Sequence, residues 1–85
     1  MTKPPRKTIH LLYFAILREE RGKAEETIQT DAQTASQLYE QLQSLHEFTL
    51  NPKVLKVAIN EEFQSWKTIL KDQDTIAFIP PVAGG

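Results

Sequence analysis

The sequence contains no cysteine. Disulfide bonds, thiolate nucleophiles and thiolate metal ligands are therefore excluded, and any sulfur chemistry must use sulfur supplied from outside the chain. The sequence also lacks an apolar run near the roughly 20 residues that a membrane-spanning helix needs. Its basic first segment, 1–7, is not followed by the apolar core of a secretion signal. We therefore expect a soluble, cytoplasmic protein.

Neither sign of charge is in large excess. Ten basic and 11 acidic residues give a net charge of -1, so the composition favours neither nucleic acid nor a membrane as a partner. His10 and His46 lie far apart in the sequence without ligand spacing around them, and we expect no metal site. The 85 residues, 40% of them apolar and 25% charged, suffice for one small globular domain.

Hydrophobic periodicity predicts one main helix, over 34–46. Thr34 and Gln37 fit a capping box, in which a hydroxyl and an amide satisfy free N–H groups at the start of a helix. The apolar stripe of this helix, at spacings of three and four, comprises Ala35, Leu38, Tyr39, Leu42 and Leu45. A stripe of this kind is typical of a helix that packs by one side on a sheet.

β-Branched and aromatic residues indicate strands. They are predicted over 8–14, 25–30, 54–60, 63–66 and 75–80. A short turn of helix over 15–20 separates the first two strands and ends before Gly22. This order of elements predicts an α+β fold: a ubiquitin-like β-grasp with a mixed sheet and one main helix on one face. We expect a disordered arm at 1–7, the domain at 8–80 and a flexible tail at 81–85.

One face of the predicted sheet is left open. Strand alternation puts Phe14 and Ile79 on the side opposite to the apolar sets of the first and last strands. Those sets are Ile9, Leu11 and Tyr13 in the first strand, and Ile76 and Phe78 in the last. Because one helix covers only one face, apolar residues on the other face indicate an interface. The alternative is that loops partly bury this face.

The C-terminal segment has an unusual composition. Pro80 and Pro81 end the last strand because proline has no N–H to donate. Gly84 and Gly85 follow, and glycine has no Cβ that would keep the backbone out of a narrow channel. The carboxylate of a terminal glycine is unhindered, so ATP can adenylate it and a sulfur or nitrogen nucleophile can then attack. A frayed terminus is the alternative.

Three stretches at the start, middle and end of the chain resemble one known pattern. Residues 76–85, IAFIPPVAGG, resemble the C-terminal signature of the molybdopterin synthase small subunits, in the MoaD/ThiS sulfur-carrier family. Residues 13–19 resemble the family's first strand and the turn after it, and 57–60 its third strand, whose asparagine opens a hairpin. Two positions depart from the pattern: Gln73 replaces a glycine that usually lies between two acidic residues, and Ile79 a common aromatic.

The resemblance implies a specific chemistry. An activating enzyme would use ATP to adenylate the carboxylate of Gly85, and sulfur transfer would convert it to a thiocarboxylate. Gly84, with Ala83, Val82 and Pro81, would form the tail that threads into the large catalytic subunit of molybdopterin synthase. There the sulfur would pass to precursor Z (cyclic pyranopterin monophosphate) to build the dithiolene of molybdopterin. The chain itself would bind no cofactor and supply no general acid or base.

The resemblance also implies a docking patch formed by Phe14, Phe63 and Ile79, with Arg18 as a further contact, and a heterotetramer with large subunits at its centre. Three alternatives remain open. They are a sulfur carrier for another pathway such as thiazole synthesis for thiamine, a ubiquitin-like modifier joined to lysines, and a β-grasp interaction module whose glycines have no role. The stretch 78–82, FIPPV, favours the molybdopterin pathway.

Overall fold

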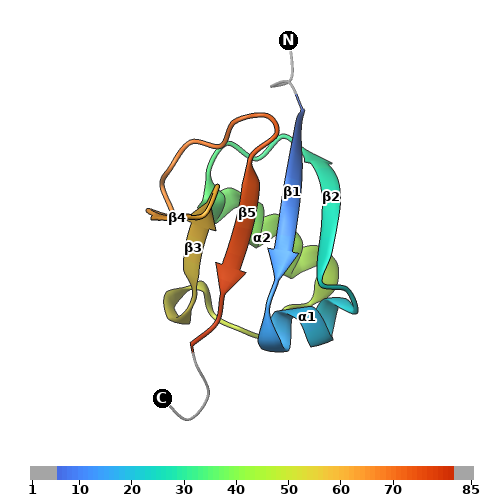
Figure 1. The fold of residues 1–85 in the computed structure, drawn as a ribbon. Helices are drawn as coiled ribbons and strands as arrows, with labels where there is room; N and C mark the ends of the chain where they lie inside the picture. Colours follow the sequence, from blue (N-terminus) through green and yellow to red (C-terminus); the bar gives the residue numbers. More distant parts are fainter. Residues whose placement is uncertain (1–5, 82–85) are drawn as a thin grey trace.

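The computed structural model describes residues 6–81 (Figure 1). The elements in order are β1 (Lys7–Tyr13), α1 (Ala15–Arg21), β2 (Glu25–Thr30), α2 (Ala35–His46), the 3-10 helix η1 (Pro52–Val54), β3 (Lys56–Ile59), β4 (Glu62–Gln64) and β5 (Thr75–Ile79). The predicted order is confirmed. The third predicted strand starts two residues late, at Lys56, because η1 occupies its predicted beginning.

The strands form one mixed sheet in the order β2-β1-β5-β3-β4. The pair β1–β5 at its centre is parallel, and the other pairs are antiparallel. In Figure 1, α2 lies behind the sheet and α1 lies at the end of β1. The predicted mixed sheet with one main helix on one face is therefore confirmed. No helix within residues 6–81 is long and apolar enough to cross a membrane.

The core lies between α2 and the sheet. The apolar sets predicted for the first and last strands are all buried: Ile9, Leu11, Tyr13, Ile76 and Phe78. Tyr39 of α2 stands at the centre of an aromatic cluster, with ring centroids 5.1 Å from Phe78 and 5.8 Å from Trp66. Trp66 also stacks on Phe78 at 5.8 Å. Contacts of this type add about 1 kcal/mol each beyond burial, and here they fix how α2 lies on the sheet.

The prediction that Leu45 belongs to the buried stripe of the main helix was wrong. Leu45 is 73% exposed, whereas the other members of the stripe are buried. In the last turn of α2, the inward position belongs to His46, four residues after Leu42, and its ring lies 5.6 Å from that of Phe48. Leu45 therefore projects into solvent at the end of the helix.

Side chains fix the turn that precedes β5. Asp72 Oδ1 accepts a hydrogen bond from the backbone N–H of Thr8, and Asp74 Oδ1 accepts one from the Asn60 amide. Between the two carboxylates, Gln73 has φ 71°, in the left-handed region that favours glycine. The departure from the family pattern at Gln73 therefore places a strained residue in an otherwise well-bonded turn.

Candidate functional site

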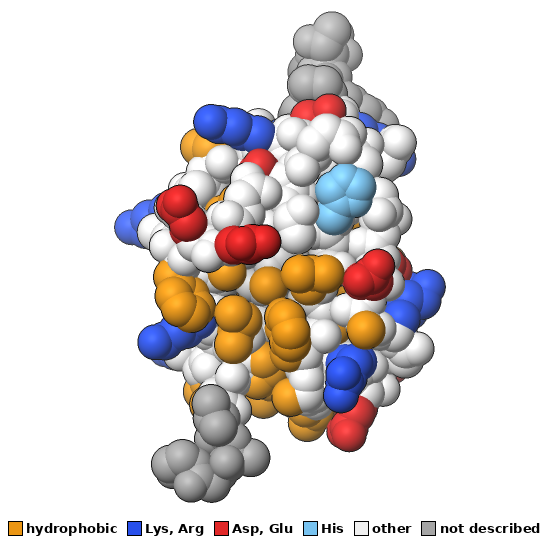
Figure 2. All heavy atoms as spheres, viewed as in Figure 1, with side chains coloured by type: hydrophobic (Ala, Val, Ile, Leu, Met, Phe, Trp, Pro, Cys, Tyr) orange, Lys and Arg blue, Asp and Glu red, His pale blue; other side chains and the backbone are white. Residues whose placement is uncertain are grey.

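The open face of the sheet carries a groove of about 440 Å³. Its lining residues are Leu12, Phe14, Ala58, Asn60, Glu61, Phe63, Thr75, Ala77 and Ile79. Figure 2, which shows the same side of the molecule as Figure 1, has hydrophobic side chains gathered over the lower half of this face. These side chains alternate along the strands with those of the core, so the groove lies on the face that α2 leaves uncovered.

Small residues form the floor of the groove. Ala58 of β3 pairs with Ala77 of β5, and Leu12 of β1 lies beside Ala77 on its other side. Phe14 follows β1, and Phe63 belongs to β4, so the two aromatic rings stand on opposite sides of the alanines in the strand order. The hollow arises because methyl groups at the centre of the sheet lie between larger side chains.

The three patch residues predicted from the sequence come together in this groove. Phe14 is 44% exposed, Phe63 is 67% exposed, and Ile79 is half-buried. Large apolar side chains this exposed and this close together indicate a surface that another protein covers. Arg18 is exposed on α1 and does not line the groove.

The alanine floor and the two polar residues of the β3–β4 turn were not among the site residues predicted from the sequence. For Leu12, strand alternation alone gives the face of the sheet, because it lies two positions before Phe14. The position of Phe63 opposite Ala58 depends on the register of the β3–β4 hairpin, which periodicity alone does not give. Glu61 in that turn carried no signal of its own, since acidic turn residues are common.

A lysine supports the exposed ring of Phe63. The Lys56 Nζ lies 5.6 Å from the centroid of this ring. Such cation–π contacts contribute about 0.5–1 kcal/mol at exposed sites. The contact favours one position of the Phe63 ring and leaves the groove beside it open.

The hairpin between β3 and β4 has a two-residue loop, Asn60 and Glu61, with φ 52° and 71°. Positive φ at both positions defines the type of turn that suits the twist of a hairpin and that usually contains Asn-Gly. The Asn60 side chain anchors the loop to the neighbouring strand. It donates a hydrogen bond to Asp74 (2.9 Å) and accepts one from the backbone N–H of Thr75 (2.9 Å). The hairpin expected at this asparagine is confirmed.

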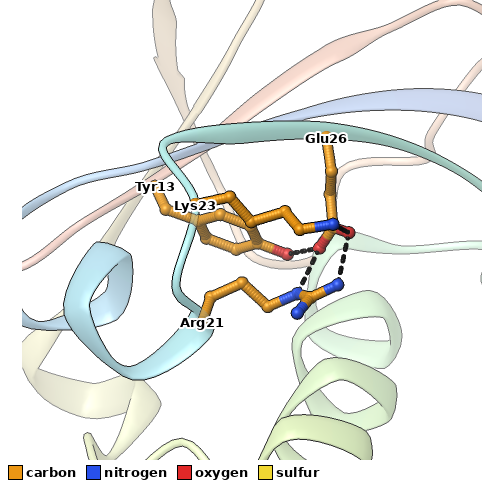
Figure 3. Close-up of polar contacts among 4 residues, drawn as sticks. All are labelled: Tyr13, Arg21, Lys23 and Glu26. Carbon is orange, nitrogen blue, oxygen red and sulfur yellow. Dashed lines mark hydrogen bonds and ion pairs between the residues drawn. The ribbon is translucent and has the colours of Figure 1, made fainter.

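A polar cluster fixes α1, and with it Phe14 (Figure 3). Arg21, the last residue of α1, donates two hydrogen bonds of 2.8 Å to Glu26 of β2. The hydroxyl of Tyr13 donates a third, of 2.6 Å, and Lys23 Nζ lies 3.8 Å from the same carboxylate. Because Phe14 caps the N-terminus of α1, the cluster also positions one wall of the groove.

The contacts in this cluster shift the pKa values of Glu26 and Tyr13 in opposite directions. The hydrogen bonds from Arg21, and then that from Tyr13, lower the pKa of Glu26 to about 2, although burial alone would raise it. Burial, followed by the hydrogen bond to Glu26, raises the pKa of the Tyr13 hydroxyl far above its ordinary value. Glu26 therefore stays ionised and Tyr13 stays protonated at any physiological pH.

The two histidines have separate surroundings. The ring nitrogens of His10 lie 3.0 Å from the Thr27 hydroxyl and 3.1 Å from the Gln73 side-chain oxygen. His46 packs against Phe48, and burial lowers its pKa. Among residues 6–81, no three side chains of His, Asp or Glu gather as metal ligands.

The groove adjoins the exit of the chain from the sheet. Ile79 ends β5 and lines the groove, Pro80 is half-buried, and Pro81 is exposed. Four residues of the predicted tail, Val82, Ala83, Gly84 and Gly85, lie outside the described residues.

The fold and the groove together define a class of protein. A five-stranded mixed sheet with a central parallel pair and one long helix across one face is a ubiquitin-like β-grasp domain. The profile of the ThiS family matches residues 11–85, and the chain belongs to that family.

Individual relatives agree with this assignment. A molybdopterin synthase sulfur carrier subunit from Haemophilus influenzae is 34% identical over 80 residues, which are 91% of this chain and 99% of the relative. Among solved structures, a protein described as molybdopterin converting factor, subunit 1, from Pyrococcus furiosus matches with a TM-score of 0.76 at 28% identity, over 89% of this chain and 99% of that one. A complex of subunits 1 and 2 of molybdopterin-converting factor from Helicobacter pylori matches with a TM-score of 0.58 at 28% identity, over 92% and 99%.

Proposed function

We propose that this chain is a sulfur carrier that supplies the sulfur of molybdopterin. Three observations support the proposal. The chain belongs to the ThiS family, the match runs through Gly85, and the relative from Haemophilus influenzae is named as a sulfur carrier subunit of molybdopterin synthase. The absence of cysteine fits a protein whose sulfur comes from elsewhere.

The proposed chemistry takes place at Gly85. A carboxylate oxygen attacks the α-phosphorus of ATP within an activating enzyme, pyrophosphate leaves, and a glycyl adenylate forms. Hydrosulfide from the sulfur donor then attacks the acyl carbon and AMP leaves, so that one carboxylate oxygen is replaced by sulfur. Glycine suits this site because no Cβ hinders attack on the carbonyl. The activating enzyme and the large subunit supply the catalytic groups, and this chain supplies the acyl group.

The observation that carries the docking step is the apolar groove beside the exit of β5. Gly85 lies six positions after Ile79, and extended chain spans at most about 3.5 Å per residue, so Gly85 reaches at most about 20 Å from the groove. A protein seated on the groove can thus receive Gly85 in a nearby active site. The complex of subunits 1 and 2 from Helicobacter pylori supports a large catalytic subunit as that protein.

In the large subunit, the thiocarboxylate would donate its sulfur to precursor Z, and two such transfers would complete the dithiolene. The role of Pro81, Val82, Ala83 and Gly84 would be to span the entrance of the active site. The rigid Pro80–Pro81 pair limits the directions in which the tail can leave the sheet.

Reconstitution of the pathway tests the proposal. The carrier, with Gly85 intact or deleted, is incubated with ATP, the activating enzyme, a sulfur donor, the large subunit and precursor Z, and molybdopterin is measured. We expect product with the intact chain and none with the deletion. Conversion of a thiazole precursor instead would support the thiamine alternative, and conjugates to lysine would support a modifier. Either result without molybdopterin would contradict the proposal.

A further inference from the structure

Glu61 is the only charged side chain among the described residues that line the groove. The polar lining residues Asn60 and Thr75 already bond to the protein, through the Asn60 side chain and the Thr75 backbone. The rest of the lining is apolar. A protein that fills the groove therefore meets an apolar surface with one carboxylate at its border.

The carboxylate of Glu61 has no cation of its own within the described part of the chain. The ion pairs among residues 6–81 are those of Glu26 with Arg21 and Lys23. Lys56, the only basic residue of β3 and β4, lies instead over the ring of Phe63. Docking would remove water from Glu61, and this costs free energy unless the docked surface brings a positive charge.

Glu61 also occupies a strained position. Among residues 6–81, five residues other than glycine have positive φ, namely Ala15, Glu47, Asn60, Glu61 and Gln73. Asn60 and Glu61 line the groove, and Ala15 directly follows the groove residue Phe14. Glycine at position 61 would relieve the strain in the two-residue loop. A strained side chain at the border of a binding surface indicates a role that the fold alone does not require.

We propose that Glu61 selects the protein that docks in the groove, by pairing with a lysine or arginine that lies beside an apolar side chain of that protein. The apolar side chain enters between Phe14 and Phe63, over the alanine floor, and the cation meets Glu61 at the β3–β4 turn. This inference rests on the proposed function for the identity of the docked protein, the large catalytic subunit.

The test uses two matched pairs of variants. Glu61→Gln removes the charge and keeps the length of the side chain, and Glu61→Gly also relieves the strain. Glu47→Gln and Glu47→Gly are the controls. Glu47 has φ 55° and caps α2, on the other face of the sheet, so each control makes the same change in charge and in backbone freedom away from the groove. The melting temperature and the Kd for the large subunit are measured at low and at high salt.

We expect both glycine variants to melt about 5 °C higher than the original chain. Glu61→Gln and Glu61→Gly should weaken binding about three- to tenfold at low salt, less at high salt, and the Glu47 variants should bind as the original chain does. Equal binding of Glu61→Gln and the original chain would overturn the inference and leave the proposed function intact. If the original chain does not bind the large subunit, both the inference about Glu61 and the proposed function are wrong.

Discussion

Replacing Glu26 with glutamine removes the negative charge that accepts hydrogen bonds from both Tyr13 and Arg21. In the folded state, the pKa of Glu26 falls from its ordinary 4.5 to about 2. At about 1.4 kcal/mol per pH unit, this corresponds to about 3 kcal/mol in favour of the folded state at neutral pH. The side chains of Arg21 and Glu26 are 22% and 11% exposed, so water screens part of the interaction. We therefore expect Glu26→Gln to lose about 2 kcal/mol.

The free energy of unfolding that Glu26 contributes depends on pH. Because the pKa of Glu26 is lower in the folded state, its contribution is complete above the ordinary pKa and is lost as the pH falls from 4.5 through about 2. The difference in unfolding free energy between Glu26→Gln and the original chain should therefore be constant from pH 7 to about 5.5 and should shrink toward pH 3.

Urea unfolding at pH 7, 5 and 3, followed by the fluorescence of Trp66, measures this difference. Trp66 is a suitable reporter because it stacks on Phe78 in the folded domain. Glu19→Gln is the control, since Glu19 is exposed on α1 and takes part in neither of the ion pairs of residues 6–81. We expect it to change stability by less than about 0.5 kcal/mol. A loss for Glu26→Gln that does not vary with pH would refute the reasoning.

Three further predictions follow from particular positions. Gln73→Gly should raise the unfolding free energy by about 1 kcal/mol in urea, because it relieves a left-handed residue; a loss would show that the bond of Gln73 to His10 outweighs the strain. Phe63→Ala should weaken binding to the large subunit about tenfold or more, with a change in stability below about 1 kcal/mol. Ile69→Ala, at a similarly exposed site outside the groove, should leave binding unchanged, and equal losses in both variants would contradict the role of the groove. Asn60→Ala should lower the unfolding free energy by about 2–3 kcal/mol, since it removes two hydrogen bonds from a strained loop; a loss below about 0.5 kcal/mol would be inconsistent with Asn60 as the anchor of the hairpin.

The architecture could be predicted from local sequence because period-2 alternation and burial agree in this chain. Ile9, Leu11 and Tyr13 alternate with Leu12 and Phe14, so the sequence separates the core face from the groove face before any pairing is known. For Leu45, periodicity and burial disagree. Periodicity places it with Leu38, but in the last turn of α2 the inward position is taken by His46, whose ring packs against Phe48, and this contact has no signal in the local sequence.

The rest of the site depends on pairings between distant elements. The groove exists because Ala58 lies beside Ala77, and that register is set by the whole sheet. The cluster of Tyr13, Arg21 and Glu26 joins three elements, and in the sequence its charges look like ordinary surface residues. Neither feature has a local signature, so both required the structure.

The most direct test of the central claim is the intact mass of the chain after incubation with ATP, the cognate activating enzyme and a sulfur donor. We predict a gain equal to the difference between one sulfur and one oxygen atom, located in the C-terminal peptide. A chain that lacks Gly85 should unfold at the same urea concentration and show no gain. An unchanged mass of the full chain, with an activating enzyme that loads another carrier in the same assay, would contradict the assignment of Gly85 as the sulfur-bearing residue.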